Sequence, residues 1–565
     1  MKPPGQTGGI LSVRLTSPTN PTKLMLRFAC LLTLATTLAV ASQAQTCPYA
    51  NLNSQAAVDA FNCTVVEGFL DVLGADVTDL TPLRGLTHVG GRLNLQVNHV
   101  LTSLSGLEDL ESVGGNVYIN LTQLQNLDGL RSLQTVGDDF VLDGNASLEN
   151  VDGLAALTSV GRDLYIFENP QLTDLDGLTA LTTVGRDLRL LSNTGLRNVS
   201  GLRSLSRLGE DLYIWACDGL VDLTGLSALR EVVGVTLRAN SELTTLDGLG
   251  PLTTVLDLDI RDNPRLTSVH GFDAITDLWA LRIEGNALLT SLQGLNALKR
   301  VTNGVRVRSN ASLASLAGLE QLRSAQFVMV DGDALVNIGA LNGLTDVSLG
   351  LTIASSPRLT TLPGFDGLTS TSRIQIVDND ALTAIDGFPN IASLQGLSIH
   401  DNDALRTLGG FDALTSVQNL VITENDRLDK CRRGLNGLIS GGAFTGVSGT
   451  VTIQDNAPGS ECTSPAAVLQ ATPSELGPDA SLALSVTPNP AARGTARVAF
   501  ALAEPSRARI AVYDALGREV ALLADEDLAS GDHEAALPGT LGAGIYVVRV
   551  EAGGSARTET ITVVR

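Results

Sequence analysis

The sequence predicts a mostly β chain, in which a right-handed β-solenoid of about 16 leucine-rich coils is followed by a small C-terminal β-sandwich. Two observations predict the solenoid: a unit of about 22 to 24 residues recurs through most of the chain, and an asparagine returns at one position of that unit. The sandwich is predicted by alternating apolar segments between glycine-rich turns near the C-terminus. Hydrophobic residues make up 44% of the 565 residues but aromatic residues only 4%, which suits thin layers of small side chains.

Residues 1–45 have the features of a secretory signal peptide. Lys23 and Arg27 precede an apolar run over residues 29–40, and the small residues at 41–44 are typical of a cleavage site. The first 24 residues match neither a signal nor a domain, so Met25 is an alternative start. No later run is long enough to predict a membrane span.

Four cysteines bracket the two ends of the predicted solenoid. Cys47 and Cys63 lie in residues 46–80, which we expect to form an N-terminal cap; Cys431 and Cys462 enclose the last coil of the solenoid, residues 81–462. Because export leads to an oxidising compartment, we predict one disulfide for each pair. Free or metal-bound thiols are the alternative. On the chain-entropy model, a disulfide closing a loop of this size stabilises the fold by about 3 kcal/mol.

The repeated unit has the form L-x-I-x-x-N-x-x-L-x-x-L-x-G-L-x-x-L-x-x-V-G-x-x, as in residues 164–187. An asparagine placed just after a strand can bond backbone groups of its own coil and of the next, so the column predicts a buried hydrogen-bond ladder. Cys217 is small enough to replace an asparagine there, which we favour over a reactive thiol. We expect the repeated glycines to supply backbone freedom at the other corners. The ladder positions are Asn98, Thr122, Asn145, Asn169, Asn193, Cys217, Asn240, Asn263, Asn286, Asn310, Gly332, Ser356, Asn379, Asn402, Asn425 and Asn456.

This repeat resembles the receptor L-domain group of leucine-rich-repeat-like proteins, over roughly residues 65–458. The resemblance implies a solenoid architecture found in receptor ectodomains and surface proteins. It implies little about the ligand, because the repeated residues build the scaffold.

Strand alternation predicts that the second and fourth residues of each L-x-I-x segment point outward. Read across coils, these columns contain an aromatic strip followed by a cationic strip, and binding hot spots favour Trp, Tyr and Arg. We therefore predict ligand contacts along them; the alternative is that these side chains merely suit exposed strands and pair with Asp259 and Glu284. The candidate contacts are Tyr118, Tyr165, Phe167, Tyr213, Trp215, Arg238, Arg261, Arg282, Arg306 and Arg308.

A third column, just before the asparagines, becomes acidic toward the C-terminal end of the repeat, at Asp378, Asp401, Glu424 and Asp455. Stacked carboxylates could collect Ca²⁺, but a solvated acidic edge is favoured because the Ca²⁺-binding nonapeptide motif is missing. We predict no metal site and no cofactor.

Residues 463–483 are rich in Ala, Ser, Thr and Pro and predict a linker to residues 484–565. Residues 488–490 read P-N-P, residues 512–520 read V-Y-D-A-L-G-R-E-V, and residues 541–549 read L-G-A-G-I-Y-V-V-R. In this order they resemble the type A C-terminal sorting domain of the type IX secretion system. The resemblance implies recognition by the type IX secretion machinery, and release or surface attachment of the cargo. An ordinary fibronectin-like accessory domain is the alternative.

A formal net charge of -22 argues against nucleic acid as a partner. The five histidines are scattered over distant coils, with no nucleophile or carboxylate pair at a useful spacing, so we predict no enzyme. We expect a secreted or outer-membrane cell-surface protein that binds an extracellular protein or glycan through the strand face of the solenoid. The alternatives are a structural surface spacer without a discrete ligand and, third, a surface glycan hydrolase.

Overall fold

The computed structural model divides into two compact units, Met1–Leu469 and Gln470–Arg565, which are described separately. The described residues of the first unit are 45–250, 252–362, 364–428, 435–440, 443–444 and 446–457. Those of the second are 483–487, 491–492, 496–502, 505–514, 519–529, 531–541, 544–552 and 555–564. The predicted signal peptide, the predicted linker up to residue 482, Cys431 and Cys462 lie outside them.

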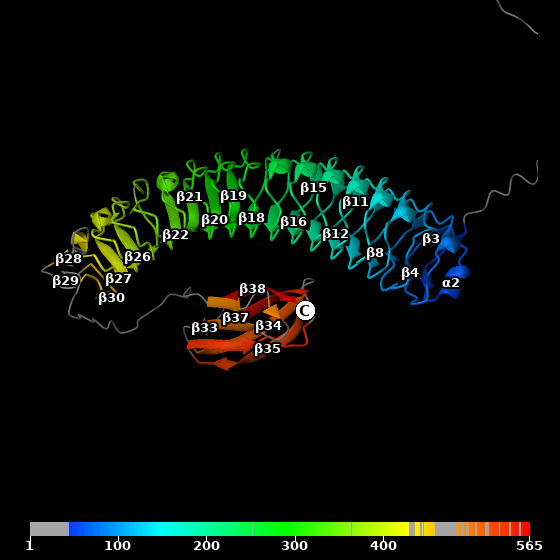
Figure 1. Ribbon diagram of the computed structural model, residues 1–565. Helices are drawn as coiled ribbons and strands as arrows, with labels where there is room; N and C mark the ends of the chain where they lie inside the picture. Colours follow the sequence, from blue (N-terminus) through cyan, green and yellow to red (C-terminus); the bar gives the residue numbers. More distant parts are fainter. Residues whose placement is uncertain are drawn as a thin grey trace, which may run out of the picture. The chain divides into compact units, whose positions relative to one another are not determined.

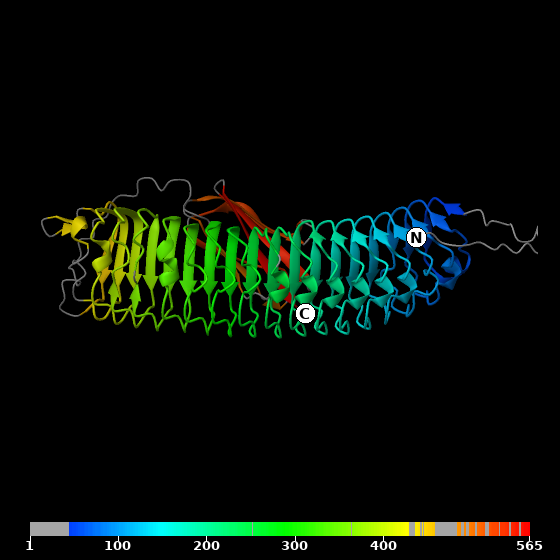
Figure 2. The same cartoon turned by 90° about the horizontal axis from the view of Figure 1, so that it is seen from above.

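The first unit is a β-solenoid, as the repeat predicts, and one parallel sheet runs along its whole length (Figures 1 and 2). Each coil adds one strand, paired in register with the corresponding strand of the next coil. The strands, in order, are β2 (Ala50–Leu52), β4 (Leu70–Val72), β6 (Leu93–Asn94), β8 (Val117–Asn120), β10 (Phe140–Asp143), β12 (Leu164–Phe167), β14 (Leu188–Leu191), β16 (Asp211–Trp215), β17 (Gly234–Arg238), β18 (Asp257–Arg261), β19 (Asp277–Glu284), β20 (Arg300–Arg308), β21 (Ser324–Asp331), β22 (Asp346–Ala354), β24 (Arg373–Val377), β26 (Ser393–His400), β27 (Ser416–Thr423) and β30 (Val451–Gln454).

A second, 8-stranded parallel sheet of very short strands forms another side of the N-terminal coils. It consists of β1 (Thr46–Cys47), β3 (Val65–Val66), β5 (His88–Val89), β7 (Ser112–Val113), β9 (Thr135–Val136), β11 (Ser159–Val160), β13 (Thr183–Val184) and β15 (Arg207–Leu208). Two-stranded pairs follow at β23 (Thr361–Leu362) with β25 (Ala384–Ile385), and at β28 (Ile439–Ser440) with β29 (Ala443–Phe444).

Single turns of 3-10 helix form the corners opposite the main sheet, which lines the inner side of the solenoid's arc in Figure 1. They are η1 (Thr81–Leu83), η2 (Asp128–Leu130), η3 (Asp152–Leu154), η4 (Asp176–Leu178), η5 (Ser200–Leu202), η6 (Thr224–Leu226), η7 (Asp247–Leu249), η8 (Gly339–Gly343), η9 (Gly409–Phe411) and η10 (Asn436–Leu438).

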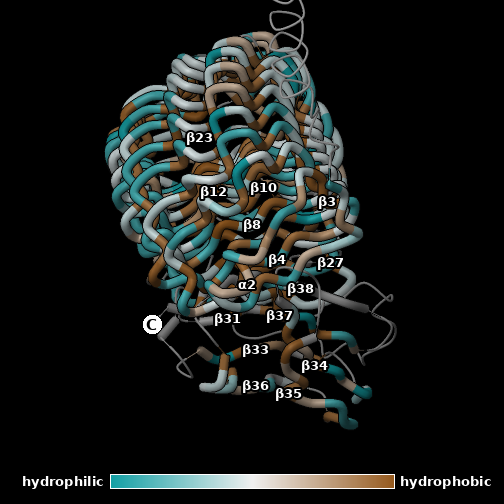
Figure 3. Tube along the Cα trace, turned by 90° about the vertical axis from the view of Figure 1, so that its right-hand side faces the viewer, coloured by the Kyte–Doolittle hydropathy of each residue, from teal (hydrophilic) through white to brown (hydrophobic). Residues whose placement is uncertain are grey.

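The core is a set of columns of leucine, valine and isoleucine, one layer per coil. Leu164, Ile166, Leu172, Leu175 and Leu178 of one coil are all fully buried, and the same pattern repeats in its neighbours. In Figure 3 the strand segments carry the hydrophobic colour, whereas hydrophilic residues follow many of the outer turns. Because each layer is covered only by the coils on either side, the coils depend on stacking for their stability.

One core column changes from leucine to phenylalanine toward the C-terminal coils. The rings of Phe365, Phe388 and Phe411 stack, with centroids 4.9 Å and 5.1 Å apart, and all three are fully buried. Offset aromatic pairs at this spacing add to the stabilisation from burial. This phenylalanine column was not predicted from the sequence.

The repeated glycines have a different role from the one expected. In η3, η4 and η5 the glycine has an ordinary backbone conformation, but a Cβ at Gly153, Gly177 or Gly201 would overlap a carbonyl of the preceding coil. The glycines of the V-G corner, such as Gly161 and Gly185, approach the preceding coil as closely. Most of these positions therefore require glycine for space between coils and not for a left-handed conformation.

The asparagine ladder is present as predicted. Asn169 is fully buried; its backbone N–H donates to Oδ1 of Asn193 (3.0 Å). The Nδ2 of Asn169 donates to the carbonyl of Leu142 in the preceding coil (3.2 Å) and to the carbonyl of Phe167 in the same coil (2.9 Å). The bond from Nδ2 to a carbonyl of the preceding coil recurs at every ladder asparagine from Asn145 to Asn456. The ladder thus satisfies the buried backbone where each coil turns away from the main sheet.

The residue before each ladder position is left-handed at most coils, including Glu168 (φ 51) and the acidic residues Asp378, Asp401 and Glu424. This is why the corner favours Asp, Ser and Gly in many coils.

Residues 46–80, for which a cap was predicted, add two strands to the main sheet and so continue the solenoid. Strands β2 and β4 belong to two coils that come before the coil of the first ladder position, Asn98. The Cys47–Cys63 disulfide is formed, as predicted. The short helix α2 (Gln55–Asp59) buries Val58 against this end of the core.

Cys217 occupies a ladder position as a buried thiol. Its backbone N–H donates to Oδ1 of Asn240 (3.1 Å), and its Sγ lies 3.4 Å from the carbonyl oxygen of Leu190. Burial raises the pKa of this thiol to about 12. Sequence reasoning therefore placed Cys217 correctly.

Cys217 is expected to resist alkylation in the folded protein, because the reactive thiolate is neither accessible nor populated near neutral pH. Iodoacetamide at pH 8, followed by mass spectrometry of the Cys217 peptide, should show modification only after denaturation. Rapid alkylation in the native state would contradict the buried assignment.

The C-terminal unit is the predicted small β-sandwich. One sheet has the order β31 (Ala483–Thr487), β33 (Arg497–Leu502), β36 (Gly531–Ala536). The other has the order β32 (Ala491–Ala492), β38 (Ser555–Val564), β37 (Gly544–Ala552), β34 (Ser506–Asp514), β35 (Glu519–Leu528). Val498 and Phe500 from the first sheet share one apolar cluster with Ile510, Val512 and Val550 from the second.

Only parts of the three motifs that resemble a sorting domain fall within the described residues. Val512, Tyr513 and Asp514 end β34, and Tyr546 and Arg549 lie in β37, which pairs with it. Residues 488–490, 515–518 and 542–543 are outside the described part of the chain.

Candidate recognition face

The predicted contact residues all lie on the outer side of the main sheet. In β12 the burial alternates, with Leu164 and Ile166 fully buried and Tyr165 and Phe167 partly exposed. Parallel in-register pairing turns each outward position into a column across coils, as predicted. In one column Tyr165 pairs with Arg189 and Arg189 with Tyr213; in the other, Trp215 pairs with Arg238 and Arg238 with Arg261.

The aromatic strip is a packed layer in which two tyrosine hydroxyls are hydrogen-bonded. The rings of Tyr165 and Phe167 stack, with centroids 5.8 Å apart. Tyr213 donates its hydroxyl to Asp211 Oδ2 (2.8 Å), and Asn116 Nδ2 donates to the hydroxyl of Tyr118 (2.9 Å). Burial raises the pKa of Tyr165 to about 12. The rings therefore form a rigid, half-buried surface.

Three of the five arginines of the cationic strip are held by carboxylates. Arg261 makes a bidentate pair with Asp259 on its own strand, with both distances 2.5 Å. Arg308 Nε donates to Asp331 Oδ2 (2.6 Å), and Arg282 Nη1 to Asp257 Oδ1 (3.2 Å). The pairing of Arg261 with Asp259 was foreseen as the alternative to a ligand role. Asp257 was missed because it lies one residue before the L-x-I-x segment of its coil, whereas Asp331 continues the column of Arg308 in the next coil and its pairing was not predicted.

Arg238 and Arg306 are held differently. Within the described residues neither guanidinium bonds a carboxylate; Arg238 lies over the Trp215 ring, 5.7 Å from its centroid, and Arg306 over the Phe327 ring at 4.5 Å. Desolvation by burial, followed by the charge of Arg261 for Arg238 and of Arg282 for Arg306, lowers the pKa of both guanidinium groups. These two cations would gain most from an added anion.

Asp143 lies at the border of the aromatic strip, between Asn120 and Phe167 in the fourth-position column. Burial, with the charge of Glu168, raises the pKa of Asp143 to about 6, from an ordinary value of 3.8. The folded chain therefore holds this proton more tightly than the unfolded chain does. The contribution of Asp143 to the free energy of unfolding therefore falls as the pH rises from about 4 through 6.

Asp143→Asn is expected to remove the loss of stability that ionisation of Asp143 causes as the pH rises. Relative to the parent, the variant should gain stability between pH 4.5 and pH 7, because asparagine carries no charge to bury. Urea unfolding of both proteins at the two pH values measures this change. Parallel pH dependence in the two proteins would show that Asp143 ionises normally.

An apolar column borders the same face and was not predicted. Its members are Val233, Leu256 and Trp279, which are 43%, 52% and 48% exposed. They belong to successive coils, because the N–H of Leu256 donates to the carbonyl of Val233 and that of Trp279 to the carbonyl of Leu256. A signal was available in the sequence, since the aligned position is charged in the preceding coils, at Arg186 and Glu210.

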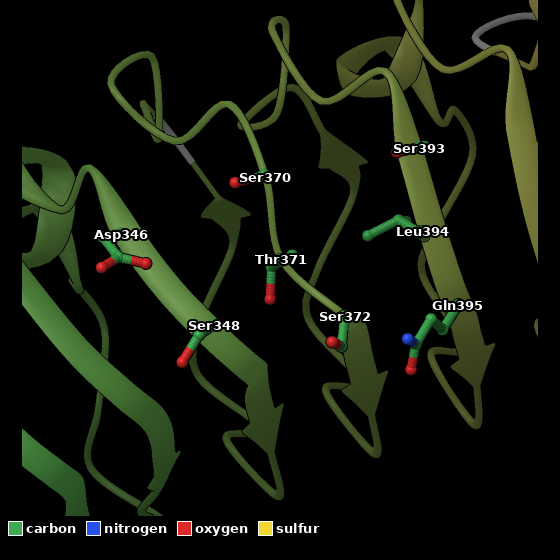
Figure 4. Close-up of a pocket in the computed structure, with 8 residues that line it drawn as sticks. All are labelled: Asp346, Ser348, Ser370, Thr371, Ser372, Ser393, Leu394 and Gln395. Atoms are coloured by element: carbon green, nitrogen blue, oxygen red, sulfur yellow. The ribbon is translucent and has the colours of Figure 1, made fainter. Parts of the chain in front are cut away.

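A shallow hollow of about 400 Å³ lies elsewhere, where one strand of the main sheet is shortened (Figure 4). Strand β22 begins at Asp346 and β26 at Ser393, whereas β24, which lies between them, begins later in its coil, at Arg373. The gap is lined by Asp346, Ser348, Ser370, Thr371, Ser372, Ser393, Leu394 and Gln395.

The acidic edge gives no structural support for a Ca²⁺ site. Among the described residues, no group of three or more His, Cys, Asp and Glu side chains is arranged to hold a metal ion. His400 Nδ1 lies 2.8 Å from Asp401 Oδ2, and this contact lowers the pKa of Asp401. No helix within the described residues has the length and apolarity needed to cross a membrane.

No protein-family model matches the chain, and no curated protein matches it. The resemblances to receptor L domains and to a type IX sorting domain therefore remain expectations from the motifs. What the geometry adds is the placement of the predicted aromatic and arginine residues on one rigid surface.

Proposed function

We propose that this chain is an exported recognition or adhesion protein, which binds an extracellular protein or glycan through the outer face of its main sheet. One observation carries the proposal: an aromatic-poor, acidic chain concentrates Tyr165, Tyr213, Trp215 and a run of arginines on that face. Such residues dominate binding hot spots. The role requires no reaction at the face.

The scaffold favours binding because it is already ordered. The asparagine ladder and the buried leucine columns fix the backbone beneath each contact, and stacking or ion pairs hold Phe167 and Arg261. Little conformational entropy would then be lost on binding.

Recognition can be tested with arrays of extracellular proteins and glycans. The combined substitutions Trp215→Ser, Arg261→Gln and Arg308→Gln should weaken binding to array ligands at least tenfold, while circular dichroism shows that the fold survives. Arg131→Gln with Arg203→Gln is the matched control, because both arginines are exposed at the opposite corners. Array binding that is unchanged by the triple variant would refute the proposed face.

A structural spacer is the second candidate, and the internal ion pairs of Arg261, Arg282 and Arg308 favour it. If these arginines only stabilise the sheet, the full-length chain should bind no array ligand. The triple variant would then lower thermal stability without changing any binding.

We further propose that residues 484–565 direct export by the type IX system, on the strength of the ordered motifs in the sequence. Deleting them should leave the protein in the periplasm of a host that carries this machinery, as measured by cell fractionation. A fusion of residues 484–565 to a periplasmic reporter is the control and should reach the surface. Surface display of the truncated chain would contradict the assignment.

A further inference from the structure

The outer face of strands β17 to β21 combines exposed apolar side chains with arginines that have no carboxylate partner. Leu256 directly precedes Asp257, the partner of Arg282, so the apolar column borders the cationic strip. Trp279 lies three residues before Arg282 on β19. Its indole ring makes no ring stacking or cation–π contact with any other described residue.

The cationic side of this surface is constructed around Phe327. A Cβ at Gly304 would overlap the Phe327 ring, so glycine leaves the space in which the ring lies, and Arg306 covers that ring. Arg238 is placed in a similar way over Trp215. Both guanidinium groups are therefore oriented by aromatic rings while their N–H donors remain available to a ligand.

We propose that this surface binds an extended, acidic polypeptide segment, whose apolar side chains cover Val233, Leu256 and Trp279 and whose carboxylates pair with Arg238 and Arg306. The proposal rests on the recognition role proposed above and names the partner class. Charge complementarity selects an acidic partner, because Arg261, Arg282 and Arg308 already have carboxylates and the remaining two arginines do not.

The apolar column favours a polypeptide over an acidic glycan. Valine and leucine offer no hydrogen bonds, so sugar hydroxyls pressed against them would lose water without compensation. Apolar side chains of a peptide would instead remove these exposed groups from water at a gain of about 25 cal/mol per Å².

The spacing of the two arginines also fits an extended chain. Arg238 lies on β17 and Arg306 on β20, three coils apart, which corresponds to about 14 Å at the usual strand spacing. An extended peptide covers about 13 Å in four residues, and residues four apart point to the same side. Carboxylates at positions i and i+4 would therefore reach both guanidinium groups.

The test uses the full-length chain, and the emission of Trp279 is obtained as the difference between the parent and Trp279→Phe, because the sequence has two tryptophans. The probe is an acetylated ten-residue peptide that alternates Leu and Glu. Binding should shift Trp279 emission to the blue and reduce acrylamide quenching at least threefold. Peptides that alternate Ser and Glu, or Leu and Lys, should cause neither change.

Variants then separate the two parts of the surface. Labelled Leu-Glu peptide, followed by fluorescence anisotropy, should bind at least tenfold more weakly to Arg238→Gln with Arg306→Gln and to Trp279→Ser. Arg131→Gln with Arg203→Gln should bind it like the parent. Equal binding to the parent and to the double-arginine variant would overturn the charge pairing.

Polygalacturonate, an acidic glycan, is the competing probe. If it protects Trp279 and the peptides do not, the partner class is wrong, although recognition by this face stands. If array ligands depend on Trp215, Arg261 and Arg308 but neither probe affects Trp279, the inference fails while the proposed function survives. If no array ligand binds and no probe protects Trp279, both are refuted.

Discussion

Gly177→Ala is expected to lower the free energy of unfolding of the solenoid by about 3 to 5 kcal/mol, although it adds a single methyl group. Gly177 lies in η4, and its added Cβ would overlap the carbonyl oxygen and carbon of Val151. The clash is with backbone, so no side-chain rotation can relieve it. The two coils would have to separate, and the hydrogen bonds and core contacts between them would weaken.

Gly332→Ala is the matched control. Gly332 lies at a ladder position, and its nearest atom to an added Cβ is the Asn310 carbonyl oxygen, at an ordinary 3.8 Å. This variant should be neutral or more stable by up to about 1 kcal/mol, because alanine reduces the entropy of the unfolded chain. Urea unfolding followed by circular dichroism measures both. Equal effects of the two substitutions would show that coil spacing adjusts easily.

The repeat predicted most of the solenoid because each coil carries the same local signals. The apolar columns, the asparagine ladder, the outward positions and the Cys47–Cys63 disulfide are all confirmed. The reason for the glycines was wrong at most positions, because a contact between backbones of adjacent coils leaves no trace in sequence spacing. Only a few, such as Gly106 (φ 117) and Gly318 (φ 115), have the left-handed conformation that was expected.

Less of the candidate site could be predicted. The columns were correct because register follows from the period, and the sequence therefore placed Trp215, Arg238 and Arg261 side by side. The ion pair of Arg282 could not be deduced, because Asp257 lies outside the L-x-I-x segment, whereas Asp331 follows Arg308 in the same outward column and its pairing was available from the register. The apolar column through Trp279 was missed because it lies outside the L-x-I-x segment on which the analysis concentrated.

Asn263→Ala should strongly destabilise the solenoid, with an expected loss of about 3 to 5 kcal/mol. The fully buried side chain donates to the carbonyls of Leu237 (2.9 Å) and Arg261 (3.0 Å), and its Oδ1 accepts from the backbone N–H of Asn240 (3.1 Å). Alanine would leave these groups in the core with no water to replace the amide. Arg261 itself belongs to the candidate face, so binding should weaken as well.

Exposed Asn296 is the control, because it bonds only to Gly294 and Gln293 at a surface corner; Asn296→Ala should change stability by less than about 0.5 kcal/mol. The reverse substitution, which introduces an asparagine, can be made at a ladder position that lacks one. At Cys217 the sulfur, a weak acceptor, faces the backbone N–H of Asn193. Cys217→Asn should therefore raise stability by about 1 kcal/mol. If it lowered stability while Asn263→Ala had no effect, the ladder would be a consequence of coil stacking and not one of its causes.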